Sequence, residues 1–79
     1  MLHVKILSPA GIIYEGEVEH ITFPGELGSF AVFSLHAPII SKLVKGNIVC
    51  YPPAADKVTV PIESGFVEVS DNQIVACIE

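Results

Sequence analysis

The residues that decide the fold are 23–46, which read FPGELGSFAVFSLHAPIISKLVKG. A loop bounded by two glycines leads into a short run that is apolar on both faces of a pleated strand. One face would carry Ala31, Phe33 and Leu35, and the other Phe30 and Val32. An antiparallel strand with one wet face alternates apolar and polar side chains. Because this run does not alternate, we expect its second face to be covered too, by another protein.

Outward from this stretch, glycines and prolines interrupt the whole chain at short intervals. Helices usually need about ten or more residues with a helical period, and few uninterrupted segments here are that long. The segments are rich in β-branched and aromatic residues, which favour strands. We therefore predict an all-β fold, a small flattened β-sandwich of about 8–10 short, mostly antiparallel strands. Residues 1–79 form a single domain of this kind.

Nine segments have the composition and spacing of strands. They are Leu2–Ser8, Ile12–Glu15, Glu17–Phe23, Ser29–Phe33, Ile39–Leu43, Asn47–Tyr51, Val58–Ile62, Gly65–Ser70 and Gln73–Ile78. Gly16 is expected to separate the second from the third. Val18 and Ile21 are both apolar but three residues apart, so a bulge or corner near residues 19–20 is needed to restore the register. Asp71 and Asn72 should form a tight hairpin turn.

Composition and charge restrict the classes of partner. Hydrophobic residues make up 51% of the chain and charged residues 16%, more apolar material than one small core easily hides, which indicates a contact surface. The net charge is -5, with four lysines and no arginine. This argues against nucleic acid and against direct binding to anionic lipid. Glu15, Glu17 and Glu19 would share one strand face, either solvated or meeting a basic partner surface.

The sequence contains no recognisable catalytic or metal-binding motif. His3, His20 and His36 lack metal-site spacing, and no nucleophile elbow or phosphate-binding loop occurs, so we expect no cofactor and no catalytic residues. Cys50 and Cys77 are interpreted as reduced thiols of a cytosolic protein, with a disulfide between neighbouring strands as the alternative. No window approaches about 18 apolar residues, so no direct membrane insertion is expected.

Four segments, in order and spacing, resemble one known family. Residues 23–46 are similar to its Pro-Gly-x-x-Gly-x-Phe-Gly-Val, Pro-Gly-His-Ala-Pro and Leu-Lys-Pro-Gly motifs. Ser8–Gly11 and Glu15–Val18 match its first turn and second strand, and residues 64–72 resemble its Gly-Gly-Phe-Leu-Glu-Val segment. The chain therefore resembles the N-terminal β-sandwich domain of the epsilon subunit of F-type ATP synthases.

The chain departs from the family pattern at positions that shape loops and contacts. Ser34-Leu35 replaces the Pro-Gly before His-Ala-Pro, and Ala31 replaces the glycine after the phenylalanine. The Lys-Pro-Gly turn of the family is Val44-Lys45-Gly46 here. Ser64 replaces the first glycine of the Gly-Gly-Phe segment, and Ser29 replaces an acidic residue that often precedes the family's phenylalanine. These changes bear on individual contact residues more than on the strand pattern.

The resemblance implies a non-catalytic rotor subunit of the central stalk, with the gamma subunit, the membrane c ring and the catalytic head as partners. It implies a peripheral position on the cytoplasmic face of the bacterial inner membrane. By the family pattern the c-ring contact would be formed by Gly25, Glu26, Leu27, Gly28, Ser29 and Phe30. The gamma contact would be formed by Phe33, Leu35, His36, Ala37 and Pro38. His36 has a second interpretation, in which it orders the turn before Pro38.

Many family members continue into a C-terminal pair of helices that can block rotation and in some cases bind ATP. This sequence stops at Glu79, so we expect neither inhibition by that route nor nucleotide binding. Either 79 residues is the natural length or the chain is a fragment. Two other classes stay open from the residues alone: a free-standing β-sandwich adaptor domain, and a small enzyme or metal protein.

Overall fold

The computed structural model describes residues 1–79 and consists of strands, turns and loops, without a helix. The strands are β1 (Leu2–Ser8), β2 (Gly11–Val18), β3 (His20–Gly25), β4 (Gly28–Phe33), β5 (Ile39–Leu43), β6 (Gly46–Tyr51), β7 (Val58–Ile62), β8 (Gly65–Ser70) and β9 (Gln73–Ile78). Nine strands fall within the predicted number, and the all-β prediction is confirmed. The structure offers no helix with the length and apolarity that a bilayer crossing requires.

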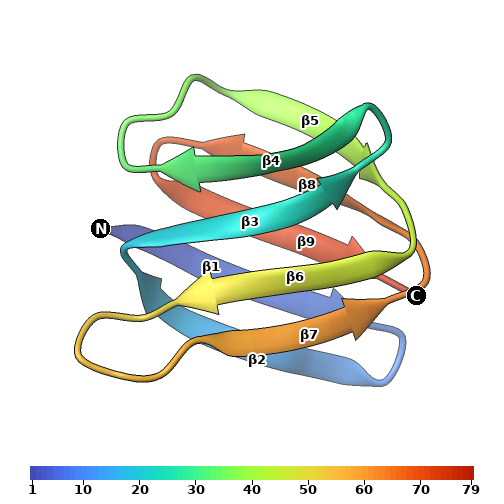
Figure 1. Ribbon diagram of the computed structural model, residues 1–79, viewed down its shortest axis with the longest axis horizontal. Coiled ribbons are helices and arrows are strands. Elements are labelled where there is room, and N and C mark those ends of the chain that lie inside the picture. Colours follow the sequence, from blue (N-terminus) through green and yellow to red (C-terminus); the bar gives the residue numbers. More distant parts are fainter.

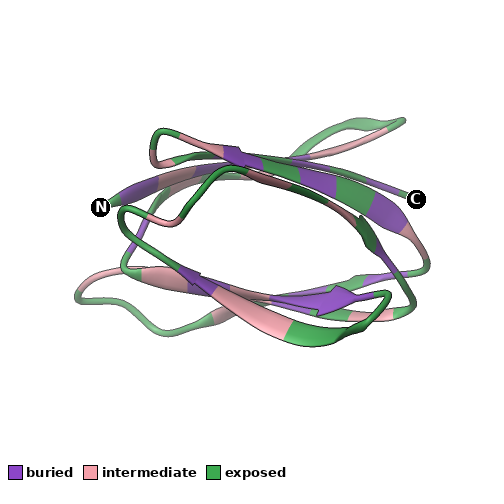
Figure 2. Cartoon of the chain, turned by 90° about the horizontal axis from the view of Figure 1, so that it is seen from above, coloured by how far each residue is buried: buried purple, intermediate pink, exposed green.

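The strands form one continuous hydrogen-bonded sheet that folds over into two layers (Figures 1 and 2). One layer has the order β2-β1-β9-β8-β5, and the other contains β4, β3, β6 and β7. The layers meet where Gly25 of β3 pairs with Leu43 of β5. All pairings are antiparallel except that of β1 with β9. This is the flattened β-sandwich expected from the spacing of the turns.

The core is a single cluster of buried apolar side chains between the layers. Buried residues alternate with exposed ones along β8 and β9, and with half-buried ones along most of β1, as the period of a strand requires (Figure 2). Each fully buried Val, Leu, Ile or Phe contributes about 1.5–3 kcal/mol relative to exposure. The cluster comprises Leu2, Val4, Ile6, Val18, Ile21, Phe23, Val32, Leu43, Ile48, Cys50, Val60, Ile62, Val67, Val69, Ile74, Ala76 and Ile78.

The predicted strand break at Gly16 is wrong, whereas the predicted corner at residues 19–20 is confirmed. Gly16 stays extended in β2, where it pairs with Val4 of β1. The chain leaves the first layer after Val18, and Glu19 donates its backbone N–H to Tyr51 O of β6 at 2.8 Å. Glu19 therefore lies outside the strand that carries Glu15 and Glu17, and the predicted run of three glutamates on one strand is wrong at this position. A further irregularity, a shift of register between Ile6 and Leu7 against β2, was not predicted.

The β8–β9 hairpin turns through Asp71 and Asn72, as predicted. Both residues have positive φ, 52° and 60°. Two consecutive left-handed residues match the twist of antiparallel strands, and Asp and Asn tolerate that conformation better than most residues. The turn thereby aligns Ser70 with Gln73 and fixes the register of both strands.

The two cysteines are free thiols in different layers, so the disulfide alternative is excluded in this structure. Cys50 of β6 is buried in the core and Cys77 of β9 is exposed. Burial disfavours the charged thiolate and raises the pKa of Cys50 to about 11. Burial, and to a lesser extent the charge of Cys50, also raises the pKa of the Tyr14 phenol. Cys50 is thus a core side chain, inert towards thiol chemistry near neutral pH.

We expect Gly65→Ala to lower the free energy of unfolding by about 1–3 kcal/mol, because the added methyl would lie 2.5 Å from Cys77 O of the paired strand. Backbone cannot move aside there without disturbing the β8–β9 ladder. Gly16→Ala is the matched control, since its methyl would meet only the Tyr14 ring at 3.5 Å or more. Its effect should stay within about 0.5 kcal/mol. Urea unfolding followed by circular dichroism measures both, and equal effects would contradict the close packing assigned to Gly65.

We expect the domain to lose stability as pH rises from about 9 to about 11. The unfolded chain releases the Cys50 proton near the ordinary thiol value of 9.0, whereas the folded chain holds it up to a pKa of about 11. The folded state therefore binds more protons in this window, and its stability falls with increasing pH. Urea titrations between pH 8 and 11 should give a shallower decline for Cys50→Ala. Cys77→Ala should decline like the unchanged chain, and three identical slopes would contradict the assignment.

Candidate partner-contact surfaces

The two segments predicted to contact partners lie at opposite ends of the sandwich (Figure 1). The β3–β4 turn lies at one end, and β4 runs the length of its layer to the β4–β5 loop at the other. The most exposed large hydrophobic residue at each end is a leucine: Leu27 in the turn is fully exposed, and Leu35 in the loop is 88% exposed. The structure therefore does not gather the predicted contact residues into one site but separates them into two.

The β3–β4 turn is held firmly while its tip stays free. Gly25 pairs with Gly28 and leaves Glu26 and Leu27 as the tip. Glu26 donates its N–H to Lys42 O of β5 at 3.0 Å, and its carboxylate lies 3.9 Å from the Lys42 ammonium. Between the turn and β5 lies an open hollow of about 530 Å³. An anchored turn with an apolar tip beside a hollow is suited to contact with a protein surface.

Phe30 plays a different part from the rest of the turn. Its ring packs against the core and lies 5.5 Å from the Phe23 ring. A methyl group at Gly25 would lie 2.8 Å from the Phe30 ring, so the backbone of the turn packs directly against this side chain. Of the six residues predicted for this contact, Gly25 is buried and Phe30 half-buried, and the other four are exposed. Phe30 thus supports the turn from below.

Phe33, at the end of β4, belongs to a stack of three rings across the second layer. Its ring lies 5.1 Å from His20 of β3, and His20 lies 4.0 Å from Tyr51 of β6, with nearly parallel planes. The stack follows from the register, which places His20 directly opposite both partners. Phe33 remains 56% exposed. It supplies a rigid apolar surface next to the β4–β5 loop.

The β4–β5 loop is ordered by one hydrogen bond to a distant turn and by local contacts of His36. Leu35 adopts a left-handed φ of 66° and donates its N–H to Asn72 Oδ1 at 2.7 Å. His36 donates its N–H to Phe33 O at 3.2 Å, and its Nδ1 lies 2.6 Å from Ala37 O. His36 therefore orders its own turn, which agrees with the second interpretation of this residue. Sequence reasoning missed Asn72, because nothing local signals a contact 37 residues away.

A second exposed apolar area, on the outer face of the first layer, was also missed. Ile40 of β5, Phe66 of β8 and Val75 of β9 are exposed there and line a shallow hollow with Cys77. The alternation of side chains along β8 could have revealed this exposed area from the sequence. Phe66 alternates with the inward-facing Val67 and Val69, so its ring had to point out of the core.

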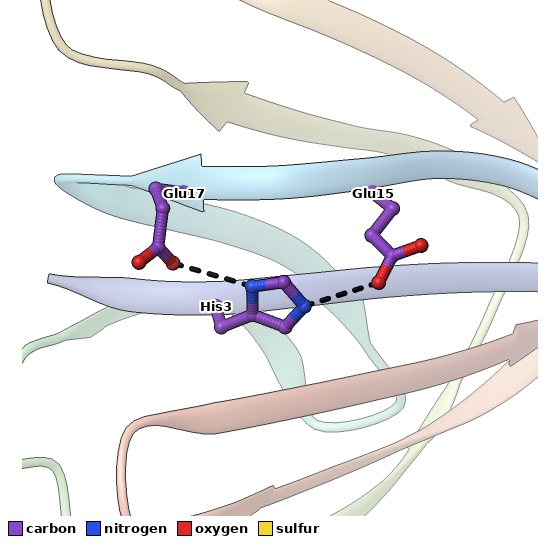
Figure 3. Close-up of polar contacts among 3 residues, drawn as sticks. All are labelled: His3, Glu15 and Glu17. Carbon is purple, nitrogen blue, oxygen red and sulfur yellow. Dashed lines mark hydrogen bonds and ion pairs between the residues drawn. The ribbon is translucent and has the colours of Figure 1, made fainter.

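The acidic residues of β2 are engaged with β1. His3 lies between the two carboxylates, with Nε2 3.2 Å from Glu15 and Nδ1 3.3 Å from Glu17 (Figure 3). Lys5 is paired opposite Glu15 in the same ladder. The engagement of both carboxylates by His3 favours a solvated strand face over an acidic docking patch. No group of three or more potential ligands has a geometry suited to a metal ion.

Comparison with known sequences gives a single consistent family. Residues 1–78 match the ATP synthase delta/epsilon chain β-sandwich domain. The ATP synthase epsilon chain of a Nitratiruptor species is 41% identical over 78 residues, which cover 99% of this chain and 60% of that relative. The epsilon chain of a Sulfurovum species is 36% identical with the same coverage. The chain thus spans 60% of the length of these curated relatives.

Solved structures agree on the fold. A chain of the Euglena gracilis mitochondrial ATP synthase, in its OSCP/F1/c-ring structure, has a TM-score of 0.90 at 19% identity and covers 98% of this chain and 49% of its own. A chain of the Tetrahymena thermophila mitochondrial ATP synthase, in its central stalk/c-ring structure, has a TM-score of 0.80 at 17% identity, with coverages of 98% and 62%. At these identities the likeness establishes the fold alone.

Proposed function

The chain belongs to the family of ATP synthase delta/epsilon chain β-sandwich domains, and from this premise we propose that it is a non-catalytic rotor subunit of the central stalk of an F-type ATP synthase. It links the gamma subunit to the membrane c ring and turns with both, so that proton translocation is coupled to ATP synthesis in the catalytic head. Its place is peripheral, on the cytoplasmic face of the bacterial inner membrane.

The observation that carries this proposal is the separation of the two contact segments. A linker in a rotor must hold two partners at once, so its contact surfaces cannot overlap. The β3–β4 turn and the β4–β5 loop lie at the two ends of β4, whose six residues span roughly 20 Å at about 3.3 Å per residue. The turn, residues 25–30, meets the c ring, and the loop, residues 33–38, meets the gamma subunit. Each end offers an exposed leucine to its partner.

The body between these ends has the stiffness that torque transmission requires. Both layers are held by continuous hydrogen-bonded ladders and by one packed core. Close-packed interiors have low compressibility and pass strain on with little deformation. Force applied at the β3–β4 turn enters β3 and β5 together, because backbone bonds join the turn to both. A twist imposed by the c ring is therefore shared by the two layers.

Recovery of the complex tests the proposal as a whole. We expect tagged chain, incubated with membranes of its source, to retain the gamma subunit, catalytic-head subunits and c ring, identified by mass spectrometry. Membranes that contain an intact synthase, assayed by their ATP synthesis, are the necessary control. Absence of all three from the recovered material would refute the rotor role and favour the free-standing adaptor.

The c-ring end can be tested by one substitution. We expect Leu27→Asp to weaken binding to isolated c ring about tenfold or more, because a charge would replace the apolar tip. Folding should be unchanged, within about 0.5 kcal/mol, since the Leu27 side chain makes no buried contact.

Ala55→Asp is the matched control, with the same new charge in the exposed β6–β7 loop. Affinity of the detergent-solubilised c ring for each labelled variant, measured by titration, gives the comparison. If Leu27→Asp and Ala55→Asp bind the c ring with equal affinity, the turn is not part of the c-ring interface. That result would say nothing against the proposed gamma contact. Phe30 is unsuitable for this purpose, since its ring supports the fold.

A further inference from the structure

Leu35 combines two features that do nothing for the stability of the isolated domain. Its φ of 66° lies in the left-handed region, where the Cβ of any L residue is crowded by the backbone and where glycine is the ordinary occupant. Its side chain is 88% exposed, so the strain is not offset by burial in the core. Strained backbone persists where the surroundings hold it in place, and such positions cluster at functional sites.

Asn72 is the residue that holds Leu35 in this conformation. Its Oδ1 accepts the Leu35 N–H at 2.7 Å, and its own backbone carbonyl accepts the His3 N–H at 2.9 Å. Asn72 is itself fixed in the left-handed turn between β8 and β9. The β4–β5 loop, the β8–β9 turn and the start of β1 therefore meet at one residue. As a result, the direction of the Leu35 Cα–Cβ bond is set before any partner binds.

The charged side chains that line the hollows beside Leu35 are acidic. The hollow beside it is lined by Leu35, His36, Pro38, Asp71 and Asn72. The adjoining hollow is lined by Pro38, Ile39, Ile40, Glu68, Val69 and Ser70. Neither contains a lysine, and the chain as a whole carries a net charge of -5. An apolar projection with an acidic border complements an apolar pocket bordered by basic residues.

We propose that Leu35 is the anchor of the gamma-facing contact, that Asn72 is its positioning residue, and that the partner presents an apolar pocket flanked by Lys or Arg. The inference rests on the proposed function, which supplies the gamma subunit as the partner. A loop backbone already held in its bound conformation loses little conformational freedom on association. The backbone strain at Leu35 is thus retained because it pre-organises the contact.

Two measurements on the same variants test this inference: urea unfolding of the chain, and its affinity for the purified gamma subunit of the same source. Leu35→Gly removes both the strain and the anchor. We expect its unfolding midpoint to rise and its affinity to fall about tenfold or more. A residue with a purely structural role would move both quantities in the same direction. Leu27→Gly, at the opposite end, is the matched control and should bind gamma like the unchanged chain.

Asn72 and Asp71 are tested by variants that keep the turn. Asn72→Gly preserves the left-handed turn but removes the acceptor for Leu35, and we expect about threefold to tenfold weaker binding. Asn72→Asp restores an acceptor oxygen and should recover the affinity. Asp71→Asn keeps the turn and removes one border charge, so binding should weaken and depend less on salt.

Each outcome is decisive. Equal affinity of Leu35→Gly and the unchanged chain would overturn the anchor, and equal affinity of Asn72→Gly would overturn the positioning role. An affinity of Asp71→Asn that matches the unchanged chain at every salt concentration would overturn the basic border of the partner. If the unchanged chain itself fails to bind gamma, the proposed function is refuted, and this inference with it. If the unchanged chain binds and the variants bind equally well, only this inference is refuted.

Discussion

The close backbone approach at Gly25 is the constraint on which the rest of the structure depends. Here β3 pairs with β4 and β5, and the sheet folds from one layer into the other. A Cβ at this position would lie 2.7 Å from Gly28 O and 2.8 Å from the Phe30 ring. A side chain here would therefore force the Gly28 backbone or the Phe30 ring to move, at the place where the two layers join. The exposed tip at Leu27 keeps its place because Gly25 has no side chain.

Much of the fold could be predicted from local pattern. The alternation in β1, β8 and β9 assigned their inward faces correctly, since one buried face imposes a period of two. Asp71 and Asn72 marked their turn through their tolerance of left-handed backbone. Gly16 misled the prediction because glycine is compatible with both a break and an extended strand. Its pairing with Val4, which decides the matter, is a tertiary fact.

The proposed contact segments, residues 25–30 and 33–38, come from motif spacing alone. Only the three-dimensional arrangement shows that they lie at opposite ends of the sandwich (Figure 1). Phe30 and Leu35 look alike in sequence, as apolar residues in an apolar run. Packing makes the first a support for the turn, and the bond to Asn72 makes the second an exposed projection. The residues next to Phe30 and Leu35 in the sequence do not show which of the two packs inward and which projects outward.

The parallel pairing of β1 with β9 has a consequence for the order of folding. The first strand cannot complete its ladder until the last strand exists, because His3 aligns with Gln73 and Leu7 with Cys77. Such long-range pairing carries a large loop-closure cost and slows folding. Until β9 has been synthesised, β1 and β8 each keep an unpaired edge, the kind of edge that templates aggregation. A nascent chain that still lacks β9 therefore exposes two strand edges at once.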